Sequence, residues 1–164
     1  MTTDTAQTTV KAPPRLRVLL RSKDAQVPKR SNDAAIGLDI YAYLLDEKGR
    51  SSNMVLGPRT TRRVPTGIVV ALENPGNWGI FIYARSGLSA QGITIANAPG
   101  VIDPDYRGEL QILLHNGSAE THYITHGDRI AQLLVLPTLA LNPVVVTELE
   151  NTERGAKGFG SSGR

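Results

Sequence analysis

The chain has 164 residues, with 18 basic and 15 acidic residues, a formal net charge of +3 and no cysteine. This length predicts one domain with a single core, and the lack of cysteine excludes disulfides, thiolate nucleophiles and thiolate metal ligands. The basic residues are scattered and aromatic residues make up only 5% of the chain, so direct nucleic-acid binding is not expected. A small polyanionic ligand fits this charge.

No apolar stretch is long enough for a signal peptide or a membrane span. We therefore expect an intracellular protein without a membrane partner, placed in the cytoplasm or, as an alternative, in the nucleus. Residues 1–14, MTTDTAQTTVKAPP, are polar, rich in threonine and end in two prolines. That composition predicts a disordered N-terminal leader.

Short apolar runs separated by turn residues follow this leader. They occupy residues 15–20, 37–45, 66–72, 78–84, 109–115, 131–137 and 143–149. Several of them alternate with period two: Ile36, Ile40 and Ala42 share one face, and Asp39 and Tyr41 share the other. Glycine and proline turns lie between the runs, and no long helical pattern interrupts them. The pattern predicts an all-β protein, a sandwich or jelly roll of many short strands.

The chain ends in RGAKGFGSSGR, residues 154–164. Its glycines spell GxGxxG, but a dinucleotide-binding fold needs that motif between a strand and a helix, and the sequence has no GxxxxGK[ST] loop. Both of these nucleotide-binding folds are therefore excluded. Composition alone predicts a solvated linker, and the alternative is a segment that closes over a site built elsewhere.

His122 and His126, together with Asp128, form a pattern that suggests a metal. A four-residue spacing brings two side chains together on a helix, whereas this stretch has the pattern of a strand followed by a turn. We therefore do not expect zinc here.

Four further stretches place a charged or hydroxyl residue beside a glycine or at a strand end, where side chains and backbone N–H groups converge. They are AIGLDIYA (35–42), ARSGL (84–88), GVIDPDYRG (100–108) and GDRIAQ (127–132). Together with the C-terminal stretch, and in this order, they resemble the five signature blocks of the homotrimeric deoxyuridine triphosphatases, over residues 15–164. Ala84 departs from the family pattern, which usually has proline at this position.

This resemblance implies a dUTPase-like β-clip, a jelly-roll sandwich with a swapped C-terminal arm, over residues 15–150. Residues 151–164 would be a Gly/Ser-rich lid over a neighbouring subunit's site in a homotrimer. The implied activity is hydrolysis of dUTP to dUMP and pyrophosphate by in-line attack of water at the α-phosphorus, with Mg²⁺ as cofactor. That reaction would limit uracil in DNA and supply dUMP for dTMP synthesis.

The resemblance also assigns catalytic roles. Asp103 would be the base that activates the water, with Asp105 as its rival, and Gln132 would position the water or a phosphate. Arg154 would contact the γ-phosphate, and Asp39 would hold magnesium through water, as an outer-shell ligand. Asp128 and Arg129 are expected to make structural contacts.

The implied substrate-binding residues come from three of the blocks. Ser86 would lie at the bridge between the α- and β-phosphates, and Tyr106 would lie against the deoxyribose and exclude a 2′-hydroxyl. Asn97 would complete the pairing with uracil, in a segment expected to form a hairpin around the base. The full set is Arg85, Ser86, Gly87, Asn97, Tyr106, Phe159, Ser161 and Ser162.

Two alternatives accompany this reading. A dCTP deaminase resembles the same family in fold and nucleotide handling, but it needs an acid/base glutamate near the base pocket, and residues 97–103 contain none. A non-enzymatic jelly roll, such as a capsid or nucleotide-sensing protein, would have no reason to keep Asp103, Tyr106 and the C-terminal stretch together. Pyrophosphate, ammonia or neither, released from dUTP and dCTP, separates the three.

Overall fold

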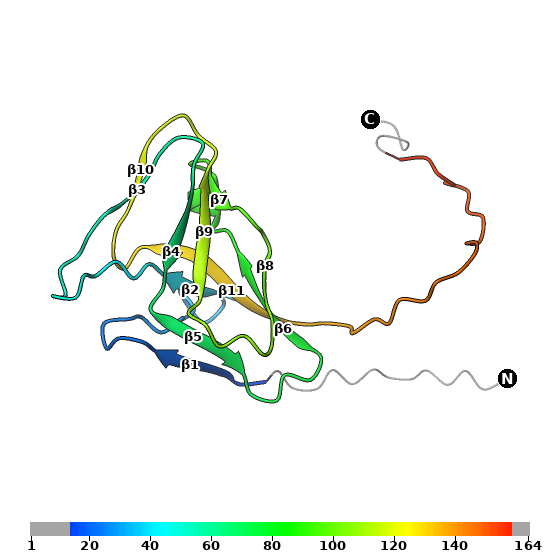
Figure 1. The fold of residues 1–164 in the computed structure, drawn as a ribbon, viewed down its shortest axis with the longest axis horizontal. Helices are drawn as coiled ribbons and strands as arrows, with labels where there is room; N and C mark the ends of the chain where they lie inside the picture. The colour runs from blue at the N-terminus through cyan, green and yellow to red at the C-terminus, as the bar shows by residue number, and fades with distance from the viewer. Residues whose placement is uncertain (1–13, 159–164) are drawn as a thin grey trace.

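The computed structural model describes residues 14–158, which form eleven strands and one helical turn (Figure 1). The strands are β1 (Leu16–Leu20), β2 (Leu38–Tyr41), β3 (Met54–Leu56), β4 (Thr61–Pro65), β5 (Ile68–Leu72), β6 (Trp78–Tyr83), β7 (Ile93–Ile95), β8 (Gly100–Ile102), β9 (Gln111–Asn116), β10 (His122–Ile124) and β11 (Arg129–Pro137). The turn is α1 (Ser86–Ser89). No helix within this part of the chain is long and apolar enough to cross a membrane.

The strands pair only antiparallel and form four sheets. The largest has the order β2-β11-β6-β8, a second has the order β4-β9-β7, and β1-β5 and β10-β3 are two-stranded. Figure 1 shows β4 and β9 running across β11, so the two larger sheets cross one another. This architecture confirms the predicted all-β class.

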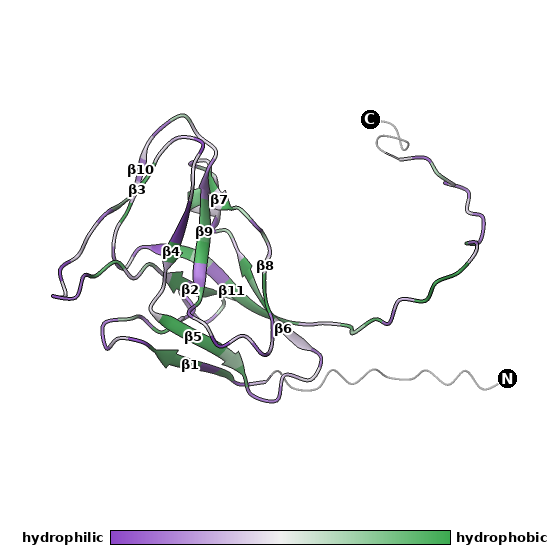
Figure 2. Cartoon of the chain, viewed as in Figure 1, coloured by the Kyte–Doolittle hydropathy of each residue, from purple (hydrophilic) through white to green (hydrophobic). Residues whose placement is uncertain are grey.

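One core joins these sheets. Alternate residues of β9 are buried, including Ile112 and Leu114, and they belong to the same cluster as Ile40, Ile82 and Leu133 of the four-stranded sheet. Burying one such side chain stabilises a fold by about 1.5–3 kcal/mol. Figure 2 shows hydrophobic colouring along β1, β5 and much of β9. The period-two pattern of the sequence therefore corresponds to a real inner face.

Strand β11 carries a β-bulge near its start. Its register against β2 shifts between Arg129 and Ala131, so Ile130 is the extra residue, and both Ile130 and Ala131 are buried. Without the bulge, strict alternation would put Arg129 on the inner face with Ala131. With it, Arg129 lies on the outer face with Gln132, opposite Tyr41.

The strand expected at 143–149 is absent from the structure. Residues 138–158 follow β11 and extend away from the sheets as an arm (Figure 1). The prediction was wrong for the single chain because this segment pairs with no other strand in the described residues. Its apolar side chains are exposed: Leu139, Leu141, Val144, Val145, Val146 and Leu149.

The polar stretch 46–63 contains strand structure that the sequence did not predict. It holds β3 and the start of β4; β10 was also not predicted, and β7 and β8 were expected only as the hairpin of the family resemblance. Four of these five strands have only three residues, and β4 exposes three of its five. Such short or polar strands have too few alternating residues to show a period.

Asn116 ties three segments together from a fully buried position in β9. Its side-chain amide donates hydrogen bonds to the carbonyl oxygens of Leu56, Gly57 and Glu120, at 2.7–3.0 Å. Its carbonyl oxygen accepts from both the backbone N–H and the hydroxyl of Ser118. Buried polar groups are tolerated when they are satisfied in this way.

We expect Asn116→Ala to lower the free energy of unfolding by about 2–4 kcal/mol, because buried carbonyl groups lose their donor. Urea unfolding followed by circular dichroism measures this change. Asn53→Ala is the matched control, since Asn53 is exposed, and it should unfold like the unsubstituted protein. A stability loss as small as that of the control would show that Asn116 does not hold these segments.

Candidate functional site

One row of residues crosses the four-stranded sheet on its outer face. Gln132 in β11 lies opposite Asp39 of β2 on one side and opposite Tyr83 of β6 on the other. Directly opposed residues on antiparallel strands point to the same face. Arg85 follows two residues after Tyr83, so the ends of three strands bring Asp39, Gln132 and Arg85 together.

Asp39 lies buried between two arginines. Its Oδ1 accepts a hydrogen bond from Nε of Arg85 at 3.1 Å, and its Oδ2 accepts one from Nη1 of Arg129 at 3.2 Å. The Asp39 side chain is 3% exposed, against 24% for Arg85 and 48% for Arg129. Arg85 also donates to the carbonyl oxygen of Arg129. Asp39 balances one of these two guanidinium charges, and Asp128 lies with both arginines on the lining of the adjacent cavity.

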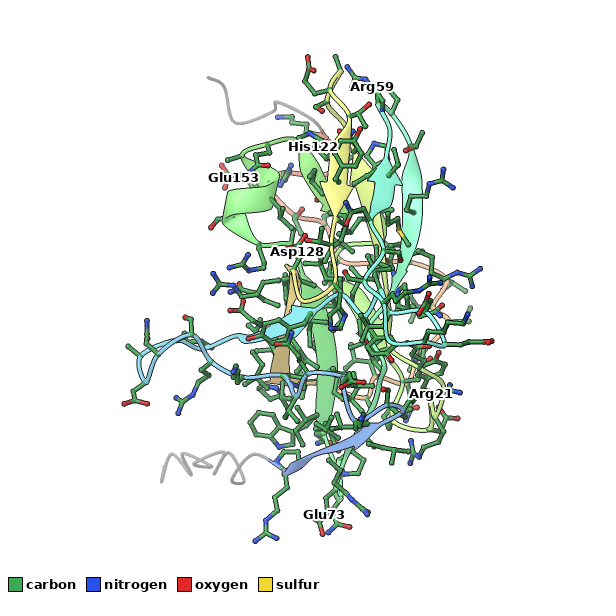
Figure 3. The ribbon with its side chains drawn as sticks, turned by 90° about the vertical axis from the view of Figure 1, so that its left-hand side faces the viewer. Arg21, Arg59, Glu73, His122, Asp128 and Glu153 are labelled. Carbon is green, nitrogen blue, oxygen red and sulfur yellow. The ribbon has the colours of Figure 1, made fainter. Side chains whose placement is uncertain are left out.

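The helical turn α1 begins directly after Arg85. Ser86 and Gly87 form its first two positions and are exposed, and a Cβ added at Gly87 would meet no atom within 4 Å. A ligand phosphate can therefore approach the backbone there. Beside the turn lies a cavity of about 360 Å³, which Arg85, Arg129, Gln91 and His122 line among others. Figure 3 shows His122 and Asp128 on the side of the molecule that carries this turn.

The remaining candidates lie in the loop between β8 and β9. Asp103 and Tyr106 are exposed there, and the N–H of Tyr106 bonds to the carbonyl oxygen of Asp103 in a turn. Arg107 closes the turn by donating to the carbonyl oxygens of Pro104 and Tyr106. This loop presents two carboxylates, Asp103 and Asp105, and one aromatic ring to solvent.

These two groups of residues do not meet within one chain. β8 pairs antiparallel with β6, with Ile102 opposite Ile80 (Figure 1). Asp103 therefore lies level with Gly79, while Arg85 lies about six residues further along the direction of β6. At about 3.3 Å per residue, the two are about 20 Å apart. The structure thus divides the predicted site into two groups. We call Asp39, Arg85, Ser86, Gly87, Arg129 and Gln132 the arginine group, and Asp103, Asp105 and Tyr106 the loop group.

The family model that matches the sequence is described as dUTPase and covers residues 23–163. The chain belongs to the dUTPase family.

Several relatives of known name resemble this dUTPase-family chain over most of its length. It is 42% identical to the deoxyuridine 5'-triphosphate nucleotidohydrolase of Desulfotalea psychrophila, over 84% of this chain and 87% of the relative. It is 41% identical to the enzyme of the same name from Wolbachia sp. subsp. Brugia malayi, over 91% and 92%.

Solved structures agree. The dUTPase of Staphylococcus bacteriophage 80alpha with dUPNHPP has a TM-score of 0.71 at 29% identity, with 92% of this chain and 99% of that one covered. A mutant dUTPase from phage phi11 of S. aureus, with a coordinated structural Mg(II) ion, has a TM-score of 0.70 at 24% identity, over 84% and 99%, which supports the fold alone.

The segment that was expected to form a hairpin around uracil does not form one. β7 belongs to the sheet with β4 and β9, whereas β8 belongs to the sheet with β2, β11 and β6. Residues 96–99 are therefore a turn that passes between two sheets, and Asn97 is exposed in that turn. The two flanking strands do not pair because each already pairs with another neighbour, β9 and β6 respectively.

The C-terminal candidates are only partly visible. Arg154 is exposed in the arm, and its Nε donates to the carbonyl oxygen of Lys157. Phe159, Ser161 and Ser162 lie outside the described residues, so their predicted contacts with uracil and phosphates remain predictions.

The donor set offers little to a resident metal. Within residues 14–158, no group of three or more His, Asp or Glu side chains is arranged to hold an ion. Each oxygen of Asp39 accepts one bond from an arginine, so a metal-bound water would have to share these oxygens with the two guanidinium groups. The outer-shell role of Asp39 therefore remains a prediction.

Asp128 and Arg129 were both expected to make structural contacts, and the structure places them differently. Asp128 does make the expected structural contact, because its carboxylate accepts the N–H of Thr125 at 2.8 Å. Arg129, also expected to be structural, reaches into the arginine group through Asp39. The bulge that turns it there leaves no recognisable signal in the sequence.

We expect Arg85→Lys to destabilise this dUTPase-family protein by about 1–3 kcal/mol, because a lysine cannot reproduce the bonds to Asp39 and to the Arg129 carbonyl together. Thermal and urea unfolding measure the change. Arg50→Lys is the matched control, since the Arg50–Asp46 pair lies on the surface and should matter far less. Equal effects of the two substitutions would contradict a structural role for the Asp39 pair.

Proposed function

We propose that the protein hydrolyses dUTP to dUMP and pyrophosphate, in sites shared between the subunits of a homotrimer. The observation that carries the shared site is the register of β6 against β8, because extended-strand spacing then puts Asp103 about 20 Å from Arg85 of the same chain. A triphosphate nucleotide contacting both groups needs them much closer. Packing of identical chains brings the loop of one subunit to the arginines of another, as closed symmetry allows.

The arginine group is proposed to bind the phosphates. Arg85 offers a guanidinium, and Ser86 and Gly87 offer a hydroxyl and open backbone N–H groups at the start of α1. Gln132 lies in the same row and is half-buried, which suits a group that orients the attacking water. The loop group, together with Asn97 in the turn between β7 and β8, is proposed to hold the nucleoside, with Asn97 at the uracil and Tyr106 at the deoxyribose.

The general base is proposed from the resemblance to the family, and the hydrogen-bond partners of the nearby carboxylates are compatible with it. Asp39 accepts hydrogen bonds from two arginines, and Oε1 of Glu109 accepts two backbone N–H groups, so both carboxylates already have structural partners. In the described residues, the carboxylates of Asp103 and Asp105 accept no hydrogen bond. Asp103 is the proposed base and Asp105 the rival.

Magnesium is proposed to enter on the phosphates of dUTP, because Mg²⁺ keeps several waters and prefers phosphate oxygens with few carboxylates. The described residues do not form a site for a resident ion, and the roles assigned here to protein residues do not depend on one. Residues 151–164 are proposed to close as a lid over a neighbouring subunit's site, with Arg154 at the γ-phosphate. A closed lid excludes bulk water from the reaction.

We expect Asp103→Asn to slow dUTP hydrolysis by at least about 10²-fold while the Kd for a non-hydrolysable dUTP analogue stays within about threefold. The substitution keeps the shape of the side chain and removes its basicity. Pyrophosphate release measures turnover, and titration calorimetry measures binding. Asp105→Asn is the matched control and should retain activity; the reverse pattern would make Asp105 the base.

Mixing two inactive variants tests the shared site. Arg85→Gln and Asp103→Asn subunits, dissociated mildly and reassembled together, should regain pyrophosphate release, because some sites then combine an intact Arg85 with an intact Asp103. Each variant treated alone in the same way supplies the baseline. Activity that never rises above this baseline would show that each chain supplies both residues to its own site.

A further inference from the structure

The ring of Tyr106 lies directly across Gly108. A Cβ added at Gly108 would lie 2.9 Å from Cε2 of that ring and would overlap its Cζ and hydroxyl oxygen still more closely. Gly108 has no positive φ, so its backbone does not require glycine. What this position requires is the absence of a side chain, because the phenol occupies that space.

The hydroxyl of Tyr106 is anchored at the same place. It donates a hydrogen bond to the carbonyl oxygen of Glu109 at 3.0 Å. The carboxylate of Glu109 in turn accepts the backbone N–H groups of Thr66 and Gly67, at 3.2 and 2.7 Å. These two residues form the turn between β4 and β5, so the anchor of the tyrosine is fixed to the body of the fold.

The next residue strengthens this connection. The N–H of Leu110 bonds to the carbonyl oxygen of Ile68 at 2.8 Å, and the Thr66 hydroxyl bonds to the carbonyl oxygen of Leu110. Leu110 is 1% exposed, whereas Tyr106 is 45% exposed. The exposed loop is therefore held at its C-terminal end, and the hydroxyl of the Tyr106 ring is hydrogen-bonded to that end although the side chain is nearly half exposed.

We propose that Gly108 and Glu109 form a seat that fixes the ring of Tyr106 and thereby sets how strongly the site discriminates deoxyribose from ribose. The inference rests on the proposed role of Tyr106 at the sugar. Steric exclusion of one hydroxyl requires a ring that cannot move aside, and a half-exposed tyrosine on a loop would otherwise have several rotamers open to it. Gly108 and Glu109 are positioning residues, because they act through Tyr106.

Gly108→Ala tests the seat. The added methyl group must displace the ring, and the end of a tyrosine side chain can swing into solvent without unfolding the loop. We expect the kcat/KM ratio of UTP to dUTP to rise at least about tenfold, with the Tm changed little. Gly57→Ala is the matched control, since a Cβ there meets only ordinary contacts at 3.8 Å, and it should leave the ratio unchanged.

Glu109 supplies a second, independent variant. Glu109→Gln keeps a side-chain oxygen that can accept the N–H groups of Thr66 and Gly67, so it should keep the sugar ratio of the unsubstituted protein. Glu109→Ala removes that acceptor and should raise the ratio. If Glu109→Ala raises the ratio and Glu109→Gln does not, the effect belongs to the anchor; if both leave it unchanged, the anchor has no role in selection.

Affinities for dUDP and UDP, measured by calorimetry, separate this proposal from the proposed hydrolysis. A protein that binds dUDP more tightly than UDP but releases no pyrophosphate from dUTP would contradict the hydrolase function. It would not contradict the seat, which the ratio of the two affinities tests. Tyr106→Ala is the reference for a lost selector. If it relaxes the preference for dUDP while Gly108→Ala does not, the seat is wrong; if it leaves the preference unchanged, both the selector and the seat are wrong.

Discussion

The β-bulge at Ile130 is the constraint on which the arginine group depends. β11 is hydrogen-bonded to β2 and β6 on its two edges, and Leu133 on its inner face is fully buried, so its register cannot slip without exposing the core. One extra residue in that fixed strand turns Arg129 to the outer face, where it meets Asp39. The buried apolar face of β11 therefore fixes the register that places Arg129 beside Asp39.

The pairing of β6 with β8 imposes a second constraint, because it carries Asp103 toward the start of β6 while Arg85 follows its end. A strand cannot shorten, so no local adjustment brings these residues together in one chain. The exposed arm fits the same need: Leu141, Val145 and Leu149 present apolar side chains that no described strand covers. A surface of this kind is usual where chains associate.

The sequence predicted strands whose hydrophobic residues alternate over several positions. It missed features that depend on partners far away in the chain. The alternation in β5 was long enough to show its period, whereas β2 buries both Asp39 and Ile40. Ile36, assigned to the inner face, is 85% exposed because it precedes β2. The run 143–149 looks like a strand because its residues suit one, but a strand also needs a partner. Glu109 gave no signal at all, since its partners Thr66 and Gly67 lie about forty residues earlier.

Asp39, Glu109 and Asp103 differ in their hydrogen-bond partners, and this difference sets what each carboxylate can do. Asp39 neutralises arginines and Glu109 accepts backbone N–H groups, so protonating or removing either would disturb the structure around it. Asp103 is exposed on a loop whose backbone is held by Arg107 and by the anchored Tyr106. A carboxylate can be both free to take a proton and well placed only when other residues do the positioning. The supporting bonds of this loop are for that reason as necessary to the proposed chemistry as the base itself.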